Sequence, residues 1–135
     1  MDDVLIVGAG PAGSVAATVL ARAGARVRIF DRAMFPRDKL CGDTINPGTL
    51  ALLQRLKLAE GIEARALRLD GMLVTGEHGV AVEGRYPDNR FGLSLSRRDF
   101  DWLLLQQALA AGASFECGVT VREAKRRDLD AAAQL

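Results

Sequence analysis

The chain has 135 residues, enough for one domain with its own hydrophobic core. Hydrophobic residues make up 49% and charged residues 26%, as in a soluble globular protein, and the net charge of +1 gives no reason to expect nucleic acid or an anionic membrane as a partner. No apolar run reaches the roughly 18 residues of a transmembrane segment, and Cys41 and Cys117 are too far apart for a metal-binding pair, which favours a reducing cytoplasm.

The first predicted element is a short strand that leads into a glycine-rich turn. Asp3 to Val7 are almost wholly apolar, and the motif Gly8-x-Gly10-x-x-Gly13 follows at once. Gly8 permits a tight bend, Gly10 lets a pyrophosphate approach the backbone, and Gly13 lets helix and strand pack closely. The free N–H groups of the following helix attract phosphate. We therefore expect this turn to bind the phosphates of a dinucleotide through Gly8, Gly10, Pro11, Ala12 and Gly13.

The helix after the turn is predicted to start at Pro11 and to end before Gly24. Its apolar positions recur at helical spacing and predict the face that packs on the sheet: Ala12, Val15, Ala16, Val19 and Leu20. Arg26 to Phe30 form a second predicted strand, with Asp31 at its carboxyl end.

Asp31 follows Gly13 at close to the spacing of about 20 residues at which an acid binds the adenosine ribose. Arg32 beside it leaves open the alternative of a ribose 2′-phosphate. The unit as a whole predicts an ADP-containing dinucleotide, either FAD or NAD(P).

The middle of the chain predicts an irregular loop, a helix and a β-rich insertion. Residues 32–43 have no periodicity, and Asn46 and Pro47 open a helix to about Leu58. Residues 62–69 favour neither helix nor strand. Residues 72–75 and 80–83 predict a β-hairpin within an insertion at about 67–95.

The last predicted elements are a capped helix and a strand. Ser96-x-x-Asp99 is a capping signature for a helix that Gly112 ends, and Ser114 to Val121 form a strand that Gly118 weakens. The predicted fold is α/β, a Rossmann-type parallel sheet with an N-terminal dinucleotide-binding βαβ unit and a small β-rich insertion.

Three motifs together resemble the N-terminal, FAD-binding part of flavoproteins of the aromatic-hydroxylase type, and most closely the geranylgeranyl-reductase-like FAD-dependent oxidoreductases. They are the glycine turn at residues 8–13, the loop Phe35-Pro-Arg37-Asp-Lys39-Leu-Cys41-Gly42 with its Pro47 helix, and Arg97-x-x-Phe100-Asp101-x-x-Leu104. The turn is shared with many flavoproteins, whereas the combination is much more specific. The resemblance implies FAD as the cofactor and leaves NAD(P)H open as the electron donor.

The resemblance also assigns roles to individual residues. It implies that Arg37 and Lys39 supply a cation to the FAD phosphates and that Cys41 and Gly42 pass near the flavin, although Cys41 also suits a small packing residue. It implies that Arg97 reaches back to the FAD, with Arg98 as the competing assignment. A backbone group within two residues of Val121 would face the adenine.

The resemblance leaves three functions open. The first is flavin-mediated reduction of a small apolar alkene such as an isoprenoid chain, which Cys41-Gly42 favours. The second is an FAD-dependent monooxygenase or halogenase, and the third is a non-catalytic dinucleotide-binding module. No acid–base or nucleophile constellation is visible, so no catalytic residue is assigned and the flavin would carry the chemistry.

The resemblance also places two cofactor-contacting motifs, D-G and G-D, after the last predicted strand. Asp70-Gly71 precedes the Arg97 helix and therefore does not supply the first of them. We expect residues 1–135 to be one FAD/NAD(P)-binding domain at the N-terminus of a larger flavoenzyme.

Overall fold

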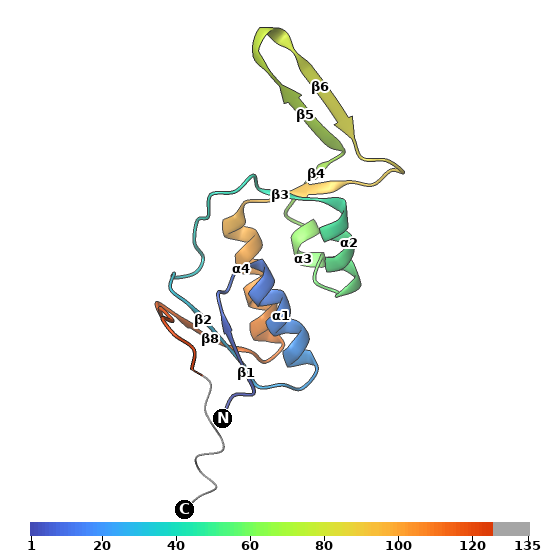
Figure 1. The fold of residues 1–135 in the computed structure, drawn as a ribbon. Helices are drawn as coiled ribbons and strands as arrows, with labels where there is room; N and C mark the ends of the chain where they lie inside the picture. The colour runs from blue at the N-terminus through green and yellow to red at the C-terminus, as the bar shows by residue number, and fades with distance from the viewer. Residues whose placement is uncertain (126–135) are drawn as a thin grey trace, which may run out of the picture.

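The computed structural model describes residues 1–125, so residues 126–135 of the predicted domain lie outside the described part. A parallel sheet of three strands has the order β1 (Val4–Val7), β2 (Val27–Asp31) and β8 (Ser114–Cys117). Helices α1 (Pro11–Arg22) and α4 (Arg97–Ala110) lie side by side against one face of this sheet (Figure 1). The structure confirms the α/β fold and the N-terminal βαβ unit.

The register of the sheet explains which side chains the helices cover. Ile6 is opposite Ile29, which is opposite Phe115, so these three side chains share one face. That face packs with Ala17 of α1 and with Leu105 and Ala108 of α4 into one core. The alternate residues of β1, Leu5 and Val7, are 61% and 65% exposed on the opposite face.

The predicted insertion at about 67–95 belongs to a larger second part of the molecule, which also includes residues 44–63. Strands β3 (Thr44–Ile45) and β4 (Leu67–Leu69) pair antiparallel with β7 (Gly92–Ser94), beside helices α2 (Pro47–Arg55) and α3 (Glu60–Glu63). The hairpin of β5 (Gly71–Thr75) and β6 (Ala81–Arg85), closed by a short 3₁₀ turn at Glu77–Gly79, projects away from the rest (Figure 1).

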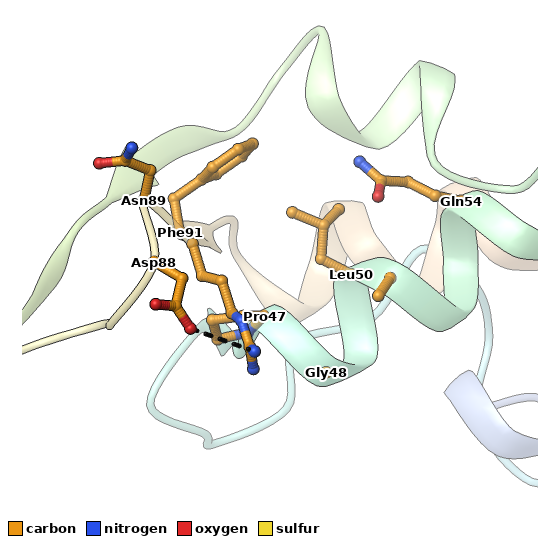
Figure 2. A pocket seen from close by; sticks show the side chains of 9 residues that line it. Pro47, Gly48, Leu50, Gln54, Asp88, Asn89 and Phe91 are labelled. Carbon is orange, nitrogen blue, oxygen red and sulfur yellow. Dashed lines mark ion pairs between the residues drawn. The ribbon is translucent and has the colours of Figure 1, made fainter.

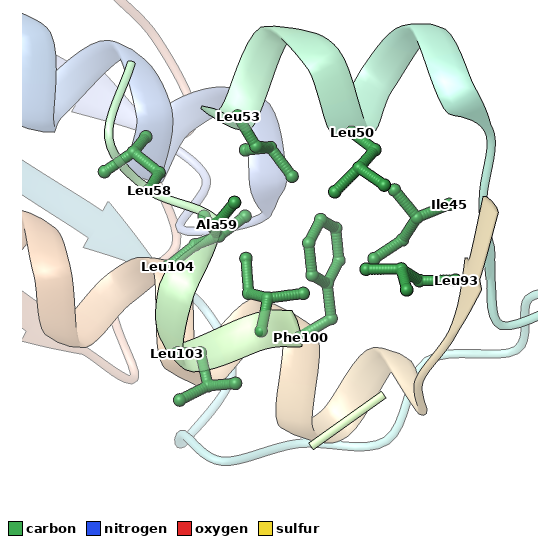
Figure 3. Close-up of a cluster of buried hydrophobic side chains, with 10 residues drawn as sticks. Ile45, Leu50, Leu53, Leu58, Ala59, Leu93, Phe100, Leu103 and Leu104 are labelled. Atoms are coloured by element: carbon green, nitrogen blue, oxygen red, sulfur yellow. The ribbon is translucent and has the colours of Figure 1, made fainter. Parts of the chain in front are cut away.

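A second hydrophobic core joins the insertion to α4. Phe100 and Leu104 of α4 pack against Leu50 of α2, Ile45 of β3 and Leu93 of β7 (Figure 3). Each of these side chains is less than one tenth exposed. Helix α4 therefore contributes to both cores.

The predicted helix starts and the predicted hairpin are confirmed. The Asn46 side chain accepts a hydrogen bond from the Thr49 N–H at 2.8 Å, and Ser96 Oγ accepts one from the Asp99 N–H at 3.2 Å. The pairing of β5 with β6 spans residues 71–75 and 81–85, slightly more than predicted.

The predicted packing face of α1 is only partly confirmed: Val15 and Leu20 are half-buried against the two cores, but Ala12, Ala16 and Val19 are exposed. The fully buried residues are Ser14, Ala17 and Thr18. Ser14 Oγ donates to the Ala9 carbonyl at 3.1 Å, and Thr18 Oγ1 donates to the Ser14 carbonyl at 2.8 Å. Because both hydroxyls are satisfied locally, they are buried at little cost.

Three further differences concern the strands. The last strand ends at Cys117 rather than Val121, because Gly118 takes a positive φ of 73° and turns the chain. The ambiguous residues 62–69 divide between α3 and β4. Strands β3 and β7 were not predicted at all.

Within residues 1–125, none of the helices combines the length and the apolar character needed to cross a membrane.

We predict that Gly13→Ala destabilises the fold. Its Cβ would lie 1.9 Å from the Gly8 carbonyl oxygen and 3.2 Å from a methyl group of Ile6. Better helix propensity would return about 1 kcal/mol, but a backbone clash of this kind costs about 1–3 kcal/mol or more. Urea unfolding should therefore show a lower midpoint. Gly10→Ala, whose Cβ meets only Arg37 Nη2 at 3.8 Å, is the control. An equal midpoint for Gly13→Ala and the unchanged protein would contradict the close packing.

Candidate functional site

Hydrogen bonds hold the glycine turn against the end of β2. Gly8 has a φ of 101°, and its N–H donates to the Phe30 carbonyl at 2.7 Å. One carboxylate oxygen of Asp31 accepts from the Ala9 N–H and the other from the Ala33 N–H, both at 2.8 Å. Asp31 therefore fixes the shape of the turn, besides standing where the sequence predicts a ribose ligand.

The N-terminus of α1 is free to receive an anion. Its N-cap is Gly10, which offers no side-chain cap, and the first turn holds no acidic residue. The first intrahelical bond runs from the Ser14 N–H to the Gly10 carbonyl at 2.9 Å. The preceding N–H groups and the positive end of the helix dipole thus have no competing side chain.

Arg37 lies over this turn. A side chain at Gly10 would meet Arg37 Nη2 and nothing else nearer than 4 Å. Arg37 Nη2 pairs with Asp101 Oδ2 at 3.0 Å, and the guanidinium stacks 4.8 Å above the Phe35 ring. Arg37 Nη1 is buried and has no hydrogen-bond partner within the described residues. A guanidinium over the turn, beside a helix N-terminus, suits an anionic ligand.

Asp101 also holds Arg97. The Arg97 Nε and Nη2 atoms donate to the two oxygens of Asp101 at 2.7 and 2.9 Å, and the Arg97 backbone N–H donates to Asp43 Oδ1 at 3.0 Å. Hydrogen bonding to Asp101 raises the pKa of Arg97 above its ordinary value. Arg97 thereby joins the loop at residues 37–43 to the start of α4.

Cys41 lies next to Arg97 in this loop, and its thiol is exposed. The Asp43 backbone N–H, and after it the Arg97 guanidinium, stabilise the thiolate and lower the pKa of Cys41 below its ordinary value. Gly42 beside it is open, since a Cβ there would meet only Thr44 Oγ1 at 3.9 Å.

A hollow of about 290 Å³ brings together the residues predicted for the adenosine half of the cofactor. The end of β1, the end of β2 and the segment after β8 line it: Val7, Gly8, Phe30, Asp31, Arg32, Val119, Thr120 and Val121. Arg32 and Val121 therefore lie around the same hollow as Asp31.

Two other hollows lie apart from the glycine turn. The first, of about 280 Å³, is lined by Lys39 with Cys41, Asp43, Arg97 and Arg98, and Arg37 does not line it. The second, of about 360 Å³, lies between α2 and residues 88–91 (Figure 2). It holds none of the predicted site residues.

Sequence reasoning missed Asp43 and the role of Asp101 in this network. Arg97 and Asp101 are four residues apart on one helix, a spacing that predicts an ion pair. Arg37 and Asp43 come from a distant loop with no periodic signal. Arg98, the competing assignment, is half exposed and faces Asp38 at 3.5 Å.

Residues 1–134 match a protein family described as "FAD binding domain". The chain is 42% identical to menaquinone reductase of Mycolicibacterium smegmatis over 88% of its own length and 29% of that protein. It is 35% identical to squalene monooxygenase of Panax ginseng, over 73% of the chain and 18% of the relative. The crystal structure of CmlS, a flavin-dependent halogenase, superposes with a TM-score of 0.76 at 31% identity, over 88% of this chain and 23% of that one. The chain thus spans less than a third of the length of each of these proteins.

We predict that Arg97→Gln slows alkylation of Cys41 at neutral pH. The substitution removes a guanidinium that stabilises the thiolate, so the pKa of Cys41 should rise and its thiolate fraction at pH 7 should fall. Iodoacetamide rates between pH 6 and 9, in a Cys117→Ser background, measure this shift. A pH profile that does not move would remove Arg97 from the environment of Cys41.

Proposed function

The chain belongs to the FAD-binding-domain family, and we propose that the protein carrying it is an FAD-dependent oxidoreductase that reduces a small apolar alkene such as an isoprenoid chain. The observation that carries the substrate class is the identity to menaquinone reductase over most of the chain. Menaquinone is an apolar compound that joins a quinone ring to an isoprenoid chain.

The described residues fit FAD at the ADP half of the cofactor. The turn at residues 8–13 and the N-terminus of α1 would receive the pyrophosphate, and the Arg37 guanidinium over Gly10 would pair with its charge. Asp31 retains lone pairs for the ribose, and the hollow at Val119–Val121 would hold the adenine. A carboxylate favours a ribose with free hydroxyls over one with a 2′-phosphate.

The chain's own part in the reaction is to bind and orient the cofactor. Bound FAD would supply the hydride and electron transfer. Arg37 and the helix N-terminus would neutralise the pyrophosphate, and the loop at residues 37–43 would stand toward the flavin half, with Arg97 holding it in place. Saturation of one alkene adds two electrons and two protons, which NAD(P)H and a solvent proton would supply.

A monooxygenase or halogenase is the second candidate function. The likeness to squalene monooxygenase and to the halogenase CmlS favours it, because both share this scaffold. A non-catalytic FAD-binding module is the third. The cytoplasmic location, the single-domain boundaries and the place of this domain within a larger flavoenzyme stay predictions.

One assay separates these functions. The purified protein is incubated with menaquinone, FAD, NAD(P)H, oxygen and chloride, and the products are analysed by mass spectrometry. A gain of two hydrogen atoms in the isoprenoid chain supports the proposal. A gain of an oxygen or a chlorine atom supports the second candidate, and unchanged menaquinone under every condition supports the third.

We predict that Gly10→Val abolishes flavin retention while the fold remains. A branched side chain at residue 10 would fill the space between the turn and Arg37, where the pyrophosphate would lie, and the Gly10 position meets no core atom. The visible spectrum of the purified variant, with circular dichroism as the measure of folding, checks this. A flavin spectrum equal to that of the unchanged protein would contradict the proposed phosphate site.

A further inference from the structure

We propose that Asp101 is the positioning residue of the phosphate site, since its ion pair with Arg37 Nη2 holds that guanidinium over the glycine turn. The inference rests on the proposed binding of FAD at this turn. It assigns a function to a buried acid that does not itself face the turn.

The burial of Asp101 requires an explanation. Its side chain is only 1% exposed, and a buried carboxylate is costly unless charged partners and hydrogen bonds compensate it. Its two oxygens receive three guanidinium nitrogens, two from Arg97 and one from Arg37. The negative charge of the Asp101 carboxylate is therefore compensated by arginines of the protein itself.

The two arginines take different parts in this cluster. Arg97 gives both Nε and Nη2 to Asp101 and lies beside Cys41, so it faces the loop. Arg37 gives only Nη2, the nitrogen that lies over Gly10, and its Nη1 is buried without a partner among the described residues. Asp101, which does not itself face the glycine turn, thus orients the Arg37 guanidinium. Because Arg97 and Asp101 are fixed on α4, the guanidinium of Arg37 is anchored to a helix although its backbone lies in a loop.

Electrostatic attraction and positioning predict opposite effects of Asp101→Asn on the affinity for FAD. Asp101→Asn removes a negative charge near the phosphate site, so long-range electrostatics alone would strengthen FAD binding. Positioning has the opposite consequence. Without the carboxylate, two guanidinium groups repel each other and Arg37 loses its anchor, so its charge-assisted hydrogen bond to the phosphate is weakened.

The test measures binding of FAD, ADP and adenosine to the purified protein by calorimetry. Asp101→Asn should weaken the binding of FAD and of ADP by about ten- to a hundredfold, which is the usual contribution of a charge-assisted hydrogen bond to affinity. It should change the affinity for adenosine, which has no phosphate, by no more than about twofold. Asp88→Asn makes the same charge change at an exposed position apart from the glycine turn and should leave all three affinities unchanged.

A double-mutant cycle with Arg37→Ala isolates the coupling. Once Arg37 is gone, Asp101→Asn should have no further effect on FAD, because Asp101 acts through Arg37. The double variant loses one charge of each sign, and thermal unfolding reports whether each variant is folded. Arg37→Lys covers the case in which Asp101→Asn does not fold. The compact ammonium of lysine cannot pair with Asp101 and also lie over the glycine turn as the broader guanidinium does, so FAD should again bind more weakly.

Several outcomes would overturn the proposal. These are equal or tighter FAD binding by Asp101→Asn, additive losses in the cycle, parallel losses for adenosine and ADP, or unchanged binding by Arg37→Lys. Absence of FAD binding by the unchanged protein would overturn the proposed function together with this inference. FAD binding that is indifferent to Asp101 would overturn the inference alone.

Discussion

Helix α4 contributes buried side chains to both hydrophobic cores, and this determines how the two halves of the molecule fit together. Phe100 and Leu104 reach the core beneath α2 and β7, whereas Leu105 and Ala108 reach the core beneath the parallel sheet. One rigid helix therefore sets the distance between the nucleotide sheet and the insertion. Its first turn carries Arg97, whose backbone N–H is bound by Asp43, so the same helix also fixes the loop beside the glycine turn.

Two acidic residues, Asp31 and Asp101, hold the hydrogen-bond donors of the site in place, although they carry no positive charge themselves. Asp31 uses its carboxylate to hold the N–H groups of Ala9 and Ala33, and Asp101 uses its own to hold Arg37 and Arg97. Donors that are already in place lose less conformational freedom when a ligand binds. The site is thus arranged for an anion, with free backbone N–H groups at the start of α1, the Arg37 guanidinium over the turn, and two carboxylates that are paired with groups of the protein.

Local chemistry was readable from the sequence because each signal lies within one element. The glycine turn, the caps Asn46 and Ser96, and the hairpin all depend on neighbouring residues. The buried face of α1 was partly misjudged for a physical reason. A hydropathy pattern excludes serine and threonine from the core, yet Ser14 bonds to the Ala9 carbonyl of the glycine turn and Thr18 bonds to the Ser14 carbonyl, so both hydroxyls can be buried.

Non-local pairing limited the rest of the prediction. Strand β3 has only two residues, and it exists because β7, far along the chain, pairs with it. The site follows the same rule. The spacing of Arg97 and Asp101 within α4 predicts their ion pair, whereas the third member, Arg37, is brought in by the path of the loop after β2. That loop carries charged residues without periodicity, so the sequence names its cations without saying which of them reaches the turn. The buried carboxylate of Asp101 selects Arg37 among these cations, because it pairs with Arg37 at 3.0 Å. Lys39 is exposed and lines a different hollow.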